Sequence, residues 1–430
     1  MSGPLAFIGS FLALLLGGGL WVGFALMALG ILALEFFRNM RIDSFLAGDL
    51  WGTATAQELV TLPLFILMGE ILFHTRLSQN LFSGLAPFVR RLPGGLLHIN
   101  VLGCTLFAAV SGSSAATTAT VGRITLRELE ERGYNRKLAL GSLAGSGTIG
   151  FLIPPSIPLI VYGVLAETSI LDLFIAGIVP GLMLATAYIA WIILASTFGP
   201  AKPPVREPST TMAQKGQALL QLLPISLLIG FVIGSMYGGY ASVTEAAAMG
   251  VLGALILTLW ERELTPTMLK AAFLGTVRTC SMIGLILAGA LFLSKAMARL
   301  AIPTEVAIAI DAMNLSPYEL ILILTLFYLF LGCFLDGLST IVMTLPVTLP
   351  LVMAAGFDPV WFGIFLVITI EMAQVTPPVG FNLFVIRNLT GESIGRIAMA
   401  AAPFCALMVC IVIILTVWPG IVTWLPAQMR

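Results

Sequence analysis

The chain has 430 residues, a formal net charge of zero, 59% hydrophobic residues and only 10% charged residues. Its mean hydropathy is +1.04. A soluble domain carries roughly a quarter charged residues, so this composition excludes a soluble globular protein. It indicates a polytopic membrane protein surrounded by a lipid bilayer. The neutral balance gives no reason to expect nucleic acid as a partner.

The first half contains a predicted hairpin. Residues 77–92 are amphipathic, and we expect them to form a helix lying at the membrane surface. Residues 97–127 follow, with the polar stretch "VSGSSAATTAT" (110–120) at their centre. Both flanks are basic and contain Arg90, Arg91, Arg123, Arg127, Arg132, Arg136 and Lys137. Basic loops are cytoplasmic, so the segment is predicted to enter the membrane and return to the same side. At about 1.5 Å per residue, each leg reaches only part-way through a hydrocarbon core of about 30 Å.

The next apolar run, 139–165, is interrupted by prolines. It contains "TIGFLIPPSIPLIVYG", in which Pro154 and Pro155 are adjacent and Pro158 follows. Proline lacks the N–H and clashes with the preceding turn, so the helix should break here. We predict a half-helix, an unwound link and a second half-helix that begins at the proline pair, where first-turn prolines are tolerated. Exposed carbonyl oxygens of such a link suit a hard monovalent cation, and free N–H groups suit an anion.

The second half repeats these features after a polar linker at 199–218 and a helix near 219–236. The segment 319–355 has a polar centre, "LDGLSTIV" (335–342), and predicts a second hairpin. The segment 361–386 contains "QVTPPVGFNLFVI" and predicts a second broken helix. Four landmark pairs keep an offset of 220–225 residues: Pro154 and Pro377, Pro180 and Pro403, Gly112 and Gly337, and Gly69 and Gly289.

Charge indicates that the second copy is inverted. The flanks of the second hairpin contain no Lys or Arg, whereas the loop after the second proline pair contains Arg387 and Arg396. This reverses the pattern of the first half. The fold class we predict is therefore an all-α polytopic membrane protein with two inverted-topology repeats, a signature of secondary transporters. Four basic residues do not fit this orientation: Arg38, Arg41, Lys295 and Arg299.

Two acidic residues lie inside predicted membrane segments. Asp336 lies at the second hairpin tip and is a functional candidate, because ionisable groups in a membrane are costly. Glu371 lies before the second proline pair, and a functional role and a structural one are equally supported. The spacing of Gly141 and Gly145 is typical of close helix packing.

No enzyme motif is present. The chain has no Gly-rich phosphate loop with Lys-Ser/Thr, no HExxH and no His/Asp set around a nucleophile. The five cysteines lie in apolar segments without metal-ligand spacing. We therefore expect transport without catalysis and without an organic cofactor.

Four motifs together resemble one family. They are "FAAVSGSSAATTATVGRI", "GTIGFLIPPSIPLIVYG", "FLDGLSTIVMTLPVTLPLV" and "VTPPVGFNLFVIRNLTG". They closely resemble the large membrane subunit of tripartite ATP-independent periplasmic (TRAP) transporters, over nearly the whole chain. The resemblance implies a bacterial inner-membrane protein that imports a small organic acid or related solute with Na⁺. It also implies a small four-helix membrane subunit and a periplasmic solute-binding protein as partners.

The resemblance further implies an elevator architecture, with a static scaffold and a moving transport domain. The scaffold would comprise residues 1–92, including the surface arm helix, and 219–312. The transport domain would comprise 93–198 and 313–430, and 199–218 would be a cytoplasmic linker.

The family's ligand sites map onto the hairpin tips. The resemblance implies at least two Na⁺ sites. The first would be formed by Ser111, Ser113, Ser114, Thr148 and Gly150, and the second by Asp336, Gly337, Ser339 and Thr376. The solute would lie near Ser114, Thr117, Pro155, Ser156 and Asn382. Where the family often has a small residue or proline after the second tip glycine, this chain has Leu338.

Two alternatives remain open. The first is a stand-alone, proton-coupled elevator transporter of an organic anion in which Asp336 or Glu371 titrates. The second is a channel or a non-transporting membrane scaffold. The sequence does not identify the solute, since neither tip carries an arginine that would indicate a carboxylate.

Overall fold

The computed structural model describes residues 3–38, 42–75, 77–199, 211–311, 315–378 and 380–429. Within these ranges the regular structure is entirely helical. Most of the predicted linker, together with Arg41, lies outside the described residues.

The first half begins with helices that precede the predicted hairpin. They are α1 (Gly3–Gly17), α2 (Val22–Arg38), α3 (Ile42–Ala54), η1 (Gln57–Val60), α4 (Thr61–Phe73) and α5 (Leu77–Val89). The hairpin and the segments after it comprise η2 (Gly95–Leu97), α6 (His98–Ser111), α7 (Ser114–Glu131), α8 (Arg136–Gly147), η3 (Thr148–Phe151), α9 (Ile157–Leu165) and α10 (Ile170–Phe198).

The second half has a corresponding order of elements. It begins with α11 (Met212–Tyr237), α12 (Val243–Trp260), α13 (Pro266–Arg299) and α14 (Ile302–Asp311). It continues with α15 (Pro317–Gly332), α16 (Gly337–Ala354), α17 (Pro359–Gln374), α18 (Phe381–Thr390), α19 (Ile394–Val417) and α20 (Gly420–Met429). A hairpin, an interrupted helix and a long apolar helix thus follow one another twice: α6 to α10 and α15 to α19.

Six of these helices are long and apolar enough to cross a membrane, namely α10, α11, α12, α13, α16 and α19. A hydrocarbon core needs about 20 apolar residues in a helix. These lengths and compositions indicate a multi-pass membrane protein.

The helix breaks at both proline pairs, but the predicted start of each second half-helix was wrong. α9 begins at Ile157 and α18 at Phe381, so Pro154–Pro155 and Pro377–Pro378 lie in the non-helical links. Ser156 supplies the N-cap of α9: its side chain accepts a hydrogen bond from the N–H of Leu159. A serine cap satisfies an N–H that would otherwise be orphaned, so this helix starts after the cap and not at the proline pair.

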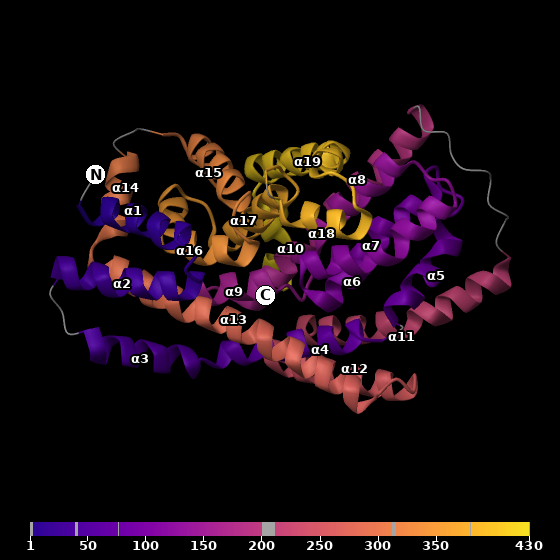
Figure 1. Ribbon diagram of the computed structural model, residues 1–430, viewed down its shortest axis with the longest axis horizontal. Coiled ribbons are helices and arrows are strands. Elements are labelled where there is room, and N and C mark those ends of the chain that lie inside the picture. Colours follow the sequence, from indigo (N-terminus) through magenta and orange to yellow (C-terminus); the bar gives the residue numbers. More distant parts are fainter. Residues whose placement is uncertain are drawn as a thin grey trace.

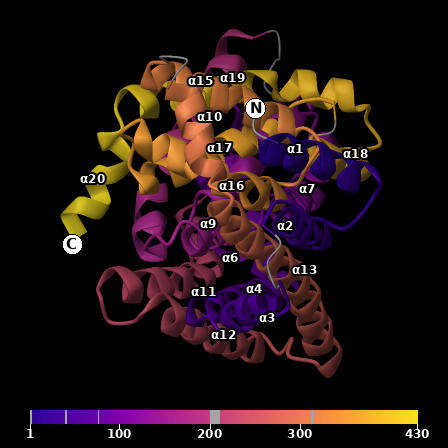
Figure 2. The same cartoon turned by 90° about the vertical axis from the view of Figure 1, so that its left-hand side faces the viewer.

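The helices form two layers. Figure 2 shows α3, α4, α11 and α12 below a bundle that contains α6 to α10 and α15 to α19. α4 packs against α12 and α13, and α13 packs along α2, so these helices form one connected group. Figure 1 shows α13 running diagonally beneath the bundle. The amphipathic α5 packs along α11 and also contacts the first hairpin through α6 and α7.

Basic residues that did not fit the charge pattern have local partners in the lower layer. The Nζ of Lys295 lies 2.6 Å from Oδ1 of Asp49. The guanidinium of Arg299 lies over the Phe45 ring at 3.9 Å, and its backbone carbonyl accepts a hydrogen bond from Arg38. These contacts hold α2, α3 and α13 together, which gives each of these cations a packing role.

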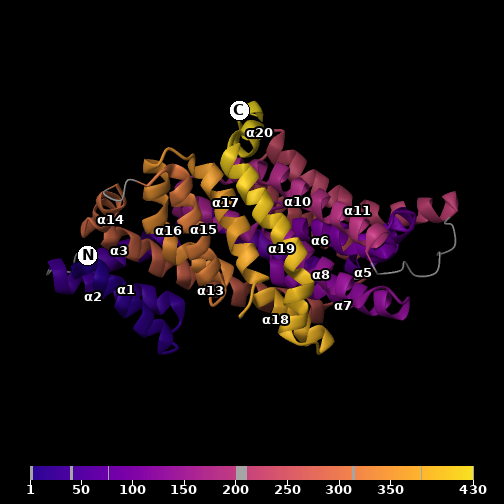
Figure 3. The ribbon, with the colours of Figure 1, turned by 90° about the horizontal axis from the view of Figure 1, so that it is seen from above.

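The closely spaced glycines of α8 allow it to approach α19, as predicted. A Cβ on Gly141 would lie 2.2 Å from the carbonyl oxygen of Ala400. A Cβ on Gly145 would lie 2.6 Å from Phe404. Figure 3 shows α19 crossing the upper face between α17 and α8, with α20 projecting at its end.

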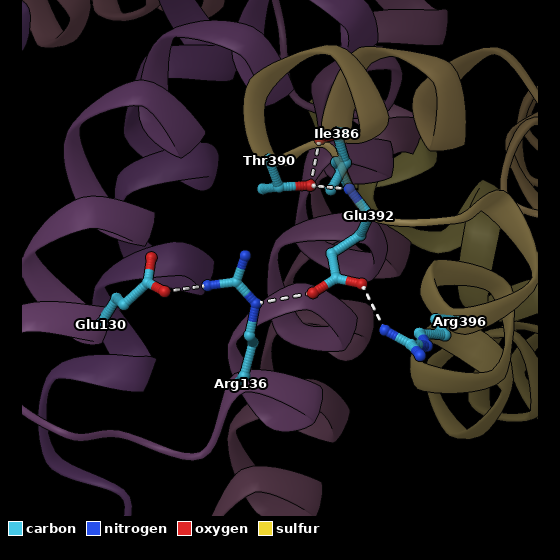
Figure 4. A network of polar contacts seen from close by, with 6 residues as sticks. All are labelled: Glu130, Arg136, Ile386, Thr390, Glu392 and Arg396. Carbon is cyan, nitrogen blue, oxygen red and sulfur yellow. Dashed lines mark hydrogen bonds and ion pairs between the residues drawn. The ribbon is translucent and has the colours of Figure 1, made fainter.

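Charged side chains also connect the two halves at the ends of α7 and α18. Nε of Arg136 donates to Oε1 of Glu392 at 2.9 Å, and Arg136 also pairs with Glu130. Arg396 pairs with the second carboxylate oxygen of Glu392 at 3.3 Å (Figure 4). The two arginines lower the pKa of Glu392 below its usual range. The network therefore ties the α7–α8 turn to the α18–α19 turn.

Candidate ion and solute site

The tip of the first hairpin lies directly against the first broken link. Gly112 ends α6 in the left-handed region, with φ +56°, and a Cβ there would lie 2.9 Å from the carbonyl oxygen of Pro155. A Cβ on Gly150 would lie 3.2 Å from Cα of Ser114 and 3.3 Å from the carbonyl oxygen of Ser113. Backbone approaches backbone at both positions, and the positive φ of Gly112 also favours glycine there.

Most of the first predicted Na⁺ set comes together at this contact. Oγ of Ser111 lies 2.7 Å from Oγ1 of Thr117 and 3.3 Å from the carbonyl oxygen of Ser113. The side chain of Ser113 caps α7, as expected for a hydroxyl at the tip. Thr148 differs, because its hydroxyl donates to the carbonyl of Gly145, three residues earlier in α8.

The residues of the second predicted Na⁺ site lie less close together. Asp336 is exposed, and its carboxylate accepts a hydrogen bond from the N–H of Ser339 at 3.1 Å, which makes it the N-cap of α16. Gly337 lies against α17, where a Cβ would meet Nε2 of Gln374 at 2.6 Å. The hydroxyl of Thr376 donates to the carbonyl of Met372. The tip and the end of α17 thus touch, while the Asp336 side chain is bonded within its own segment and the Thr376 hydroxyl also contacts Sγ of Cys405 in α19 at 3.8 Å.

A cavity of about 360 Å³ borders the first tip. Its lining comes from α4, α13, the α6–α7 tip, the η3–α9 region and the start of α16. Ser111 and Ser113 contribute hydroxyls from the tip, Glu70 and Thr279 come from the lower layer, and Leu338 comes from the second tip. The cavity therefore lies where the two layers meet, beside the backbone contact at Gly112.

The predicted solute residues lie outside the lining of this cavity. They are Ser114, Thr117, Pro155, Ser156 and Asn382. All five are buried, and Ser156 is occupied in capping α9. Their contact with the solute stays a prediction. Ser111 and Ser113 line the cavity and are therefore closer to a molecule that enters it.

Glu371 is the most unusual polar residue near the tip. Its side chain is fully buried, and Oε2 accepts a hydrogen bond from Oγ of Ser114 at 3.0 Å. The same Oγ accepts a hydrogen bond from Nδ2 of Asn382 at 2.6 Å. Both Asn382 and Ser114 are also fully buried. Three side chains from α7, α17 and α18 therefore meet behind the tip.

Glu371 is outside the ligand sets predicted from the sequence, and Glu70 was not among the predicted functional residues. For both, the available signal was an acidic residue within an otherwise apolar helix. That signal indicates a functional candidate without indicating which element it faces.

The ligands available near both tips are oxygens. They come from hydroxyls, backbone carbonyls, an amide and single carboxylates. In the described part of the chain, no group of three or more His, Cys, Asp or Glu side chains could hold a metal ion. Hard cations prefer oxygen ligands, so the donor types fit a Na⁺ ion.

Comparison with known proteins identifies the family. Residues 8–421 match the model of the tripartite ATP-independent periplasmic transporter, DctM component. The C4-dicarboxylate TRAP transporter large permease protein DctM of Pseudomonas aeruginosa is 33% identical over 402 residues, covering 92% of each chain. The 2,3-diketo-L-gulonate TRAP transporter large permease protein YiaN of Escherichia coli is 30% identical, covering 96% of this chain and 97% of the relative.

A solved structure supports the same architecture. The YdaH transporter of Alcanivorax borkumensis superimposes with a TM-score of 0.64 at 15% identity, covering 88% of each chain. Identity this low indicates a shared fold alone. The family match over nearly the whole chain is the stronger finding, and the chain belongs to the DctM component family, the large permease subunits of TRAP transporters.

Proposed function

We propose that this chain is the solute-translocating subunit of a Na⁺-coupled importer for a small organic acid in the bacterial inner membrane. The observation that carries the proposal is the contact between the Gly112 tip and the Pro155 carbonyl, which borders a cavity between two helical layers. Transporter sites are typically built where discontinuous helices leave backbone groups free.

An organic acid is proposed because relatives over most of the chain are named for C4-dicarboxylates and for 2,3-diketo-L-gulonate. The residues that line the cavity include one carboxylate, Glu70, and no Lys or Arg. A bound anion would therefore depend on backbone N–H groups at the start of α7 and on Na⁺ for its charge balance.

The two layers suggest how translocation proceeds. We assign the lower layer, with α2 to α4 and α11 to α13, to a static scaffold, and the two hairpins with their interrupted helices to a moving domain. The two halves of that domain would be inverted in the membrane, with the α6–α7 tip entering from the cytoplasmic side. Na⁺ would order the tips, create the solute site and allow the loaded domain to move against the scaffold.

Two partners complete the system. A periplasmic binding protein would deliver the solute, and a small four-helix membrane subunit would enlarge the scaffold. Exposed apolar side chains on α11, α12 and α13, such as Leu227, Ile256 and Phe273, offer a membrane-embedded surface for lipid or for such a subunit.

Reconstituted uptake tests the proposal. Proteoliposomes containing the chain and the small subunit should accumulate solute only with the cognate binding protein outside and an inward Na⁺ gradient. Equal uptake driven by a pH gradient without Na⁺ would refute Na⁺ coupling and support a proton-coupled transporter. Rapid, non-saturating flux would instead indicate a channel.

A further inference from the structure

Three buried side chains behind the first tip leave two oxygen atoms without partners. Oγ of Ser114 donates to Oε2 of Glu371 and accepts from Nδ2 of Asn382. Oε1 of Glu371 and Oδ1 of Asn382 are buried and make no hydrogen bond. All three residues are 0% exposed. Buried polar atoms are almost always paired, so two orphaned oxygens in one cluster require an explanation.

The same cluster lacks a compensating positive charge. In the described ranges, Glu371 makes no ion pair, and its hydrogen-bond partner is a neutral hydroxyl. Tyr188 of α10 is a titratable neighbour of Glu371, and it carries no positive charge. An unpaired carboxylate in a dry interior is strongly unfavourable, so Glu371 requires either a proton or a bound cation.

We propose that Glu371, Asn382 and Ser114 form a binding site for a monovalent cation, occupied by Na⁺, with Glu371 as its charged ligand. This inference rests on the Na⁺ coupling proposed above and specifies residues for it. One ion would neutralise the carboxylate and satisfy both orphaned oxygens. The donors are a carboxylate, an amide oxygen and a hydroxyl, which are hard ligands that suit Na⁺ and offer no soft donor for a transition metal.

The position of the cluster connects the ion to the solute cavity. Ser113 lines the cavity, and Ser114, the next residue, belongs to the cluster. Glu371 and Asn382 come from α17 and α18, on either side of the second proline pair. An ion held here would join the first hairpin to the second broken helix, so its binding would fix the tip that forms one wall of the cavity.

The test uses the purified full-length chain and its Na⁺-dependent thermal unfolding, with choline chloride keeping the ionic strength constant. A ligand that binds only the folded state raises Tm with its concentration. Wild type should melt at higher temperature as Na⁺ rises. Glu371→Gln should lose most of that rise, and it should melt without Na⁺ at or above the wild-type temperature, because glutamine needs no counter-ion.

Two further variants and a control sharpen the result. Ser114→Ala should also weaken the Na⁺ response, and Glu371→Asp, which keeps the charge, should shift the response to higher Na⁺. Thr369→Val is the matched control, since Thr369 is buried on the same helix and its hydroxyl donates only to the carbonyl of Phe365. It should retain the wild-type response. In uptake assays with the complete transporter, Glu371→Gln should lower the Hill coefficient for Na⁺.

Each contrary outcome has its own meaning. A wild-type Na⁺ response that Glu371→Gln preserves would remove Glu371 from the site while leaving Na⁺ coupling intact. Failure of Glu371→Gln to fold would also overturn the inference, since it predicts that a neutral isostere is tolerated. Stability that follows pH and not Na⁺, and loses that dependence in Glu371→Gln, would assign the site to a proton. A wild type with no Na⁺ response in either assay would refute the proposed function itself.

Discussion

Replacing Gly112 with alanine tests the contact between the first hairpin tip and the first broken link, on which the proposed function rests. Gly112 has φ +56°, and a left-handed conformation costs an L-residue roughly 1–2 kcal/mol. The new Cβ would lie 2.9 Å from the Pro155 carbonyl oxygen, whereas ordinary contacts begin at 3.4 Å, so the link must retreat by about 0.5 Å. Overpacking of this kind costs about 1–3 kcal/mol. We expect a total loss of about 2–5 kcal/mol, concentrated at the tip.

Gly133 provides the matched control. It lies in the α7–α8 turn with φ +73°, and nothing lies within 4 Å of the added Cβ. Gly133→Ala therefore has the conformational cost without the clash. Thermal unfolding and Na⁺-driven uptake should both fall further in Gly112→Ala than in Gly133→Ala. Equal effects in the two variants would show that the tip does not depend on close approach to the Pro155 carbonyl.

Three more predictions follow from single contacts. Gly141→Ala should lower Tm, because the new Cβ would lie 2.2 Å from the carbonyl oxygen of Ala400. The control is Gly395→Ala in α19, where the new Cβ meets open space, so Tm should stay unchanged or rise. The folded protein lowers the pKa of Glu392 below its unfolded value, which is near 4.3. Ionised Glu392 therefore stabilises the fold fully above that unfolded pKa, and this stabilisation is lost as the pH falls through the lower folded pKa. Melting curves from pH 3 to 7 should therefore differ between wild type and Glu392→Gln mainly above pH 4, and a difference that grew at lower pH would contradict this sign. Asp336→Asn should keep Tm, since asparagine caps helices as well as aspartate does, but should weaken Na⁺ activation of uptake, whereas Asp336→Ala should also destabilise α16 by about 1 kcal/mol. Unchanged Na⁺ activation in Asp336→Asn would remove this carboxylate from the second ion site.

Much of the local structure could be predicted because it depends on short-range chemistry. Two adjacent prolines remove two N–H groups, and the second disfavours the helical conformation of the first, so breaks near Pro154 and Pro377 could be expected. Single prolines such as Pro180 and Pro403 stay inside α10 and α19. The exact starts were missed because capping by Ser156 and the conformation of Gly380 decide where α9 and α18 begin. Those choices depend on how each link lies against its neighbours.

The position of the candidate site along the chain could be predicted from sequence, but the arrangement of its side chains could not. The tip residues Ser111, Ser113 and Ser114 were identified, and the structure places Ser113 and Ser114 beside Gly150. The direction of each side chain could not be predicted. Ser113 lines the cavity while the adjacent Ser114 faces inward, because consecutive residues of a helix start point in different directions.

The sequence by itself therefore determined the membrane character, the two hairpins, the two helix breaks and the family. Each of these follows from composition, from proline chemistry or from contiguous motifs. Only the tertiary structure decided that Glu371 meets Ser114, 257 positions away, and that Asn382 meets the same hydroxyl across 268 positions. Contacts over such separations depend on how whole helices pack, and a buried carboxylate reveals its missing counter-charge only when every neighbour around it is known.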